Sequence, residues 1–203
     1  MKTIAFISLC FVLALGVDLN LISFKTYGVT INRVTTIEAS DINWAVGDSG
    51  QVFKLSQSGC ILPNYPVTLN AEYNLTGVSF ANSQIGYIVG YKRDGSDKWK
   101  GAIWKTENGG ENWSVQYPVV VEGLTVPFLD VHAVDERHAW ISCGHGEVLR
   151  TTDGGNNWVR KTKPGGDSHF GWLWGIDAPD ANTAWVCSDQ SGLIAMTTNG
   201  SDS

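Results

Sequence analysis

Short runs of alternating apolar and polar residues recur along almost the whole chain. Four of these runs are residues 34–37, 77–80, 129–134 and 173–178. Each is followed by a run that opens with an aromatic residue and continues through β-branched residues to a glycine or serine. The four aromatic residues are Trp44, Tyr87, Trp140 and Trp185, spaced 43 to 53 residues apart. Period-two alternation predicts strands, and no stretch after residue 16 has the 3.6-residue period of a helix. The chain is therefore predicted to be all-β.

A third strand and a polar, glycine-containing turn complete each repeat. The third strands are predicted at residues 51–55, 102–106, 147–151 and 193–197. In the second and third repeats, the turns that follow share a Thr, an Asp or Asn two residues later, and then a glycine and a tryptophan. The fourth repeat matches this pattern as far as Ser201, one residue short of the expected aromatic. Their matching residues are Thr106, Asn108, Gly110, Trp113, Thr151, Asp153, Gly155, Trp158, Thr197 and Asn199. The first repeat departs from this pattern, with Leu55, Gln57, Gly59 and Leu62 in the corresponding places. Three or four short strands in this period are typical of a propeller blade.

Residues 151–158 match the Asp-box, Ser/Thr-x-Asp-x-Gly-x-x-Trp, in full, and residues 106–113 match it with Asn for Asp. Together with the aromatic-x-Val-Gly strands, these turns resemble the photosystem II assembly/stability-factor type of β-propeller and its non-photosynthetic relatives. More distantly, they resemble the Asp-box propellers of sialidases, xyloglucanases and sortilin-type receptors. The resemblance implies four-stranded blades at about residues 34–70, 75–118, 128–162 and 173–203. Four blades at most, the last without its outermost strand, predict an incomplete or open ring.

Turn chemistry explains the shared polar residues. An Asp or Asn oxygen accepts hydrogen bonds from backbone N–H groups in a tight turn, and glycine adopts positive φ values without strain. The tryptophan is expected to pack beneath the hairpin and bury its ring. These residues are therefore interpreted as structural, and no catalytic residue, metal site or cofactor is predicted.

The first sixteen residues have the pattern of a signal peptide. Lys2 supplies a positive charge, residues 4–15 are almost entirely apolar, and small residues precede an expected cleavage site before Val17. The apolar run is too short to span a bilayer comfortably. A secreted or extracytoplasmic protein is expected, with residues 17–33 as an N-terminal segment that contains a candidate closing strand.

Three cysteines, Cys60, Cys143 and Cys187, remain after removal of such a signal. An odd number leaves either one thiol that pairs outside this chain or three buried, unpaired side chains.

Charge and composition exclude several functions. A net charge of −6 and a pI near 5.1 argue against nucleic-acid binding, which requires a basic surface. A sialidase requires an arginine cluster for the substrate carboxylate, and none of the scattered arginines lies in such a motif. Glu38, Asp130 and Asp177 lie on or near innermost strands, but the sequence does not pair them as a glycosidase would require.

The loops opposite the Asp-box turns are the candidate binding face. Residues 91–99 lengthen a loop of the second blade, residues 161–174 lead into the fourth, and residues 117–128 lead into the third. Aromatic rings beside charged groups can bind a peptide or a sugar. The candidate residues are Arg93, Asp94, Asp97, Trp99, Asp167, His169 and Trp172. The structural alternative is that these tryptophans pack into the core.

The sequence therefore predicts a non-catalytic, exported propeller that binds a protein or a glycan. The alternative is a fragment of a carbohydrate-active enzyme with its catalytic residues outside this chain. Of the three glycosylation sequons, the one at Asn74 is expected to be used if a eukaryote secretes the protein, because the other two lie within Asp-box turns.

Overall fold

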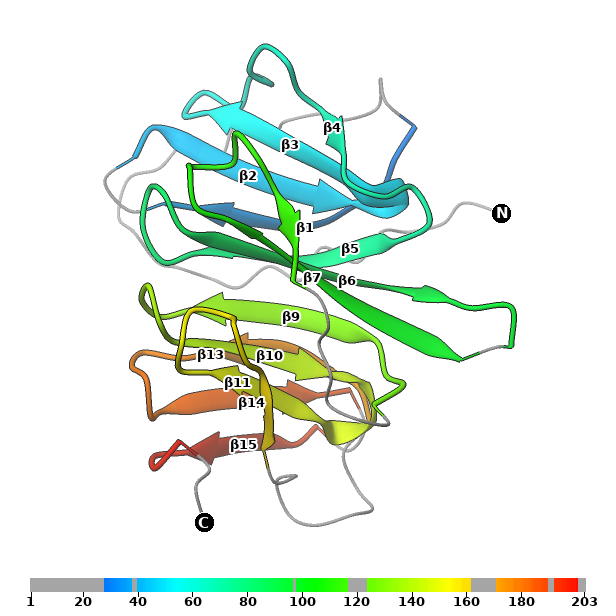
Figure 1. Ribbon diagram of the computed structural model, residues 1–203, viewed down its shortest axis with the longest axis vertical. Helices are drawn as coiled ribbons and strands as arrows, with labels where there is room; N and C mark the ends of the chain where they lie inside the picture. The colour runs from blue at the N-terminus through cyan, green and yellow to red at the C-terminus, as the bar shows by residue number, and fades with distance from the viewer. Residues whose placement is uncertain are drawn as a thin grey trace.

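The computed structural model describes residues 28–37, 40–96, 98–116, 124–161, 171–189 and 192–200. In these residues, fifteen strands form four antiparallel sheets, and successive sheets are stacked side by side (Figure 1). The prediction of an all-β, incomplete propeller without a closed ring is confirmed. The predicted signal peptide and most of the candidate closing strand lie outside the described residues. No helix in the described part of the chain is long and apolar enough to cross a membrane.

Each sheet is one blade, and its strands pair with their neighbours in chain order. Blade I contains β1 (Ile31–Thr36), β2 (Ile42–Gly47), β3 (Gln51–Ser56) and β4 (Val67–Thr68). Blade II contains β5 (Asn74–Phe80), β6 (Gly86–Arg93), β7 (Trp99–Thr106) and β8 (Ser114–Val115). Blade III contains β9 (Phe128–Ala133), β10 (Ala139–Cys143), β11 (Val148–Thr151) and β12 (Val159–Lys161). Blade IV contains β13 (Leu173–Asp177), β14 (Ala184–Ser188) and β15 (Ile194–Thr197).

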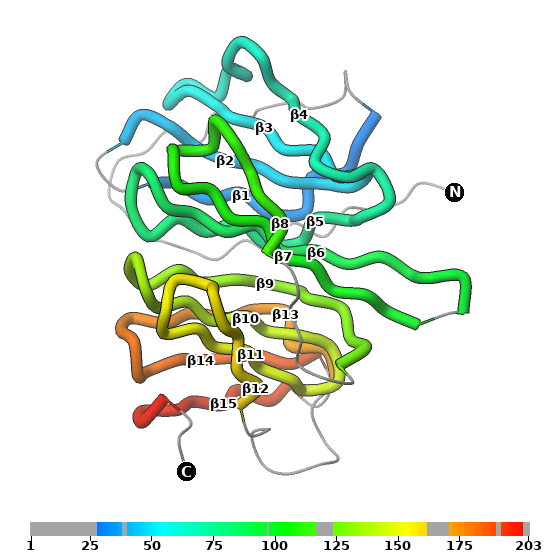
Figure 2. Tube along the Cα trace, in the orientation of Figure 1, coloured from blue at the N-terminus to red at the C-terminus, as the bar shows by residue number. Residues whose placement is uncertain are grey.

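The first strand of each blade is the innermost one, and these strands contact one another in the order β1, β5, β9, β13. Strand β1 begins three residues before the boundary predicted at residue 34, so residues 31–33 lie within blade I. Short 3₁₀ turns, η1 (Asp48–Gly50) and η2 (Gly144–Gly146), join the second and third strands of blades I and III. The corresponding connection of blade II is a long hairpin (Figure 2).

The core lies between the blades. Trp44, Tyr87 and Trp140, the aromatic residues of the repeat, are completely buried. Trp44 stacks on Phe80 with ring centroids 5.2 Å apart, and Tyr87 meets Trp158 edge to face at 5.9 Å. Because each of these contacts joins one blade to the next, the repeat that identifies the fold also supplies the residues that hold it together.

A basic residue lies across the sheet from each buried aromatic. Lys54 lies over the ring of Trp44 and donates a hydrogen bond of 3.1 Å to the carbonyl oxygen of Gly109 in blade II. Arg150 lies over the ring of Trp140 and donates a bond of 3.3 Å to the carbonyl oxygen of Gly200 in blade IV. Aromatic packing and a hydrogen bond from a charged group thus act together at these blade interfaces.

Candidate binding face

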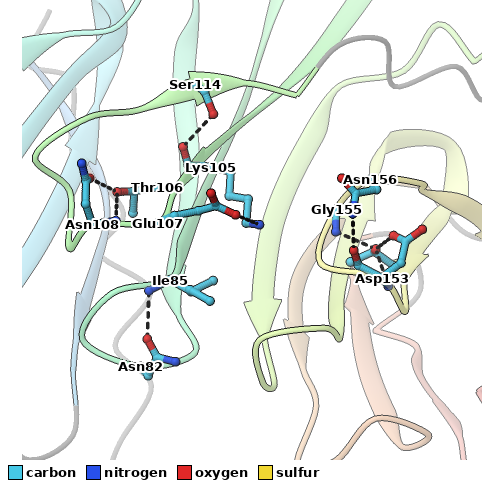
Figure 3. Close-up of polar contacts among 11 residues, drawn as sticks. Asn82, Ile85, Lys105, Thr106, Glu107, Asn108, Ser114, Asp153, Gly155 and Asn156 are labelled. Carbon is cyan, nitrogen blue, oxygen red and sulfur yellow. Dashed lines mark hydrogen bonds and ion pairs between the residues drawn. The ribbon is translucent and has the colours of Figure 1, made fainter.

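The polar turn of blade II is built around one hydroxyl group. The Thr106 hydroxyl accepts a hydrogen bond of 2.9 Å from the backbone of Gly110. It donates one of 3.0 Å to the Asn108 side-chain oxygen (Figure 3). That oxygen in turn accepts a bond of 2.9 Å from the backbone of Asn112. Gly110 has a φ of +84°, a conformation that favours glycine.

The turn of blade III repeats this network with an acid. Thr151 donates to Asp153 at 2.9 Å and accepts from the backbone of Gly155 at 2.9 Å, and Asp153 accepts from Asn157 at 2.9 Å. Partial burial acts to raise the pKa of Asp153, but the hydrogen bonds from Asn157 and Thr151 outweigh it and hold the pKa below its ordinary value. This carboxylate is thus engaged within its own turn.

The other two turns differ in how much of the network they keep. Thr197 donates to Asn199 at 2.9 Å in blade IV, as its counterparts do. In blade I the network is shifted by one residue from the aligned positions, because the Ser56 hydroxyl accepts a bond of 3.1 Å from the backbone of Cys60. The sequence alignment placed Leu55 at that position. The shift preserves the turn without a threonine or an aspartate.

The opposite end of blade II carries the long hairpin. Strands β6 and β7 stay paired without interruption from Gly86 and Thr106 at one end to Arg93 and Trp99 at the other. The hairpin projects beyond the neighbouring sheets (Figures 1 and 2). Since the polar turn follows Thr106, the hairpin tip and the polar turn lie at opposite ends of the same strand.

Asp94 closes the hairpin tip. It accepts hydrogen bonds from the Ser96 hydroxyl at 2.6 Å, from the Ser96 backbone at 2.9 Å and from the Lys98 backbone at 3.1 Å. The hydrogen bonds from Ser96 are the main reason that the pKa of Asp94 falls to about 2. The role that the structure gives to this predicted binding residue is the shape of the turn.

Four aromatic rings meet beside the tip of the hairpin. Trp99 lies 5.1 Å from Tyr91 and 5.3 Å from Trp172, with the ring planes nearly perpendicular in both pairs. Trp172 stacks on Trp174 at 5.3 Å, and the Arg93 guanidinium lies 4.3 Å from the ring of Trp99. These five residues are named the aromatic face. It joins blade II to blade IV across about 80 residues of sequence.

Two connections hold the blade IV half of the aromatic face in place. The backbone of Trp172 donates a hydrogen bond of 3.1 Å to the side chain of Asp189, and the carbonyl of Gly171 accepts one of 2.8 Å from Gly146. A β-bulge between Leu173 and Gly175 turns Trp174 outward, where it remains 47 % exposed. Trp99 and Trp172 are half-buried. The face is therefore fixed by its surroundings and open on one side.

The structure brings together some of the predicted binding residues and adds others. Arg93, Trp99 and Trp172 meet in the aromatic face, whereas Asp97, Asp167 and His169 lie outside the described residues. Tyr91 and Trp174 were not among the predicted residues. Trp174 lies on β13, where the buried residues Leu173 and Ile176 are three positions apart and do not follow a strict alternation. The period-two pattern that predicted this strand therefore did not predict that Trp174 is exposed.

The two carboxylates of the innermost strands each lie beside a basic side chain. Asp130 of β9 is buried and pairs with Arg33 of β1, and it also accepts a hydrogen bond of 3.2 Å from the backbone of Ile176. Burial raises the pKa of Asp130 to about 6, although Arg33 acts to lower it. Asp177 of β13 lies 3.1 Å from Nδ1 of His132. Burial lowers the pKa of His132 more than Asp177 raises it.

Two further features concern chemistry at the surface. Among the described residues, no group of three or more His, Cys, Asp or Glu side chains is placed to hold a metal ion. Asn74, the predicted glycosylation site, is the exposed first residue of β5. Its use as a glycan acceptor stays a prediction.

The proteins similar to this chain include one relative in sequence and two solved structures. No family model matches the chain. The photosystem II assembly lipoprotein Ycf48 of Synechococcus sp. (strain CC9902) is 25 % identical over 118 residues, which cover 54 % of this chain and 33 % of the relative. The solved structure of YCF48 bound to D1 peptide matches with a TM-score of 0.62 and 20 % identity, over 83 % of this chain and 51 % of that one. YCF48 from Cyanidioschyzon merolae matches with a TM-score of 0.45 and 16 % identity, over 90 % of this chain and 73 % of that one.

The fold and the comparisons define an incomplete β-propeller. The likeness to Ycf48 in sequence and in structure confirms the predicted resemblance to the photosystem II assembly-factor type of propeller. The chain spans about a third of the sequence relative and about half of the solved structure with the higher TM-score.

Proposed function

We propose that this chain is a non-catalytic propeller scaffold that acts outside the cytosol and binds an extended segment of a partner protein at the aromatic face. The observation that carries the proposal is the gathering of Tyr91, Trp99, Trp172 and Trp174 into one partly exposed cluster. Clustered aromatic rings with a fixed orientation bind apolar or aromatic side chains at low entropic cost.

Two observations favour a protein partner over a sugar or a substrate. One solved structure with a similar fold is that of YCF48 bound to D1 peptide, so a propeller of this kind holds a peptide. Buried Asp130 is paired with Arg33, and Asp177 lies beside His132, which supports a scaffold over an enzyme. Export is supported by the signal-like pattern of residues 1–16 and by the description of the sequence relative as a lipoprotein.

The test is selection of a phage-displayed library of random twelve-residue peptides on the purified chain. We expect enrichment of peptides with apolar or aromatic residues, and loss of their binding in Trp99→Ala and Trp174→Ala variants. Val159→Ala is the matched control, since Val159 is an exposed apolar residue on β12 of blade III. Peptides that bind both tryptophan variants and wild type equally would exclude this face. A glycan array that gives a signal lost in the same two variants would favour a glycan ligand instead.

A further inference from the structure

The geometry of the aromatic face restricts the chemistry of the segment that it can bind. Its rings touch one another directly: the centroids of Tyr91 and Trp99 are 5.1 Å apart, and those of Trp99 and Trp172 are 5.3 Å apart. A cage for a quaternary ammonium group instead needs rings that surround an open space for the cation. The Arg93 guanidinium also lies 4.3 Å from the ring of Trp99 and would repel a second cation. The charge and spacing of the face therefore favour a neutral or acidic ligand over a cationic one.

Apart from the hydroxyl of Tyr91, the aromatic face offers hydrogen-bond donors and no acceptors. Each of its three indole rings has one N–H donor and no acceptor, and the guanidinium of Arg93 is likewise a donor only. Three nearby carboxylates already accept hydrogen bonds from neighbouring groups, namely Asp48, Asp94 and Asp189. A ligand that covers the face therefore needs acceptors and should bring few donors, because a donor that is covered without a partner costs free energy.

A proline-rich segment has this balance of groups. Proline keeps its backbone carbonyl and lacks the backbone N–H, so a run of prolines brings acceptors without donors. A segment in β-strand conformation brings one donor with every acceptor, and the face has almost nothing to accept from those donors. Proline-rich segments also adopt the polyproline II helix before they bind, so they lose little conformational freedom on an aromatic surface.

The dimensions of the face agree with those of this helix. The rings of Trp99, Trp172 and Trp174 follow one another in two steps of 5.3 Å. One turn of a polyproline II helix contains three residues at about 3.1 Å each, so it advances slightly less than two such steps. Prolines three positions apart can therefore reach both ends of the row. At one end, Trp174 is 47 % exposed and accessible to a proline ring.

We propose that the segment bound at the aromatic face is proline-rich and lies on it as a polyproline II helix. Prolines three positions apart contact the ends of the row, and backbone carbonyls between them accept hydrogen bonds from the indole N–H groups. This inference rests on the proposed function, since it names the chemistry of the partner segment at the same site.

Anisotropy titrations with dye-labelled decaproline test the proposal. We expect saturable binding to the purified chain with a dissociation constant below about 1 mM, and no binding of a dye-labelled Gly-Ser peptide of the same length, which is a flexible coil. Trp99→Ala and Trp174→Ala should each weaken decaproline binding at least about tenfold. Val159→Ala changes an exposed valine of blade III and should leave binding unchanged.

Trp174→Phe isolates the contribution of the hydrogen bond. Phenylalanine keeps an aromatic ring but has no N–H, so decaproline binding should weaken roughly two- to tenfold through the loss of one hydrogen bond. Because Trp174 is partly exposed, we expect this variant to unfold at the same urea concentration as wild type. Equal binding by a folded Trp174→Phe variant and wild type would overturn the donor-based inference.

The phage library separates failure of this inference from failure of the proposed function. Selected peptides with prolines three positions apart support both. Selected peptides that lose binding in Trp99→Ala and Trp174→Ala, but are no richer in proline than the starting library, support the protein-binding role and overturn the proline-rich partner. The inference is also overturned if decaproline at about 1 mM does not bind, or if it binds the two alanine variants as tightly as wild type.

Discussion

Replacement of Gly110 by alanine should strongly destabilise the contact between blades I and II. Gly110 lies in the polar turn of blade II and faces the ring of Trp44 in blade I. A Cβ at this position would overlap Cη2 and Cζ2 of Trp44 and lie 3.1 Å from Cζ3. Trp44 is completely buried and packed against Tyr65, Phe80 and Trp113, so its ring has no free space into which it can move.

Two costs add at this position. The φ of +84° is a left-handed conformation, which costs a residue with a Cβ about 1–2 kcal/mol. Inserting a methyl group into a packed core costs about 1–3 kcal/mol more. The free energy of unfolding should therefore fall by about 2–5 kcal/mol in Gly110→Ala.

Gly192→Ala separates the two costs. Gly192 has a φ of +61°, but a Cβ there would meet nothing within 4 Å, so only the backbone cost of about 1–2 kcal/mol remains. Urea unfolding followed by tryptophan fluorescence measures both variants against wild type. If Gly110→Ala costs no more than Gly192→Ala, the turn does not pack on Trp44 as described, and the account of blade packing is wrong.

Three further predictions concern other parts of the fold. Trp158→Ala should cost about 3–5 kcal/mol in urea unfolding as a large core truncation, whereas Asp153→Ala should cost about 0.5–2 kcal/mol as the loss of a cap; equal costs would contradict this division. The pKa of Asp130, about 6 in the folded state and about 3.9 when unfolded, means that the folded state binds its proton more tightly. The free energy of unfolding should fall by on the order of 2 kcal/mol as pH rises from 4 to 6, and Asp130→Asn should remove this slope. Intact-mass analysis of protein secreted from eukaryotic cells should show a glycan at Asn74; modification at Asn112 instead would contradict the predicted loop positions.

The fold could be predicted from the sequence because its determinants are local and repeated. The spacing of Trp44, Tyr87, Trp140 and Trp185 depends only on the length of a blade, and period-two alternation marks each strand. The turn residues act on atoms at most four residues away, as Thr106 does on Gly110. Such short-range patterns are visible in one sequence.

The aromatic face could be predicted only in part because its contacts are long-range. The loops that contain Trp99 and Trp172 were predicted to lie on one face, but the contact between the rings depends on how blades II and IV are placed around the arc. The exposure of Trp174 depends on a β-bulge between Leu173 and Gly175, and no residue type in the sequence predicts that bulge. The pairing of Arg33 with Asp130 joins β1 to β9 past the intervening β5, and nothing in the spacing predicts it.

The two ends of a blade are under different constraints, which explains why the aromatic face lies where it does. At the polar-turn end, Gly110 touches Trp44 of the preceding blade and Gly109 accepts the Lys54 hydrogen bond, so a change in turn length there would disturb a blade interface. At the hairpin end, β6 and β7 extend together to Arg93 and Trp99 in unbroken register. Residues can be added at that end while the buried rows of the sheet keep their partners. A binding surface can therefore vary at the hairpin end without loss of the packing that holds the propeller together.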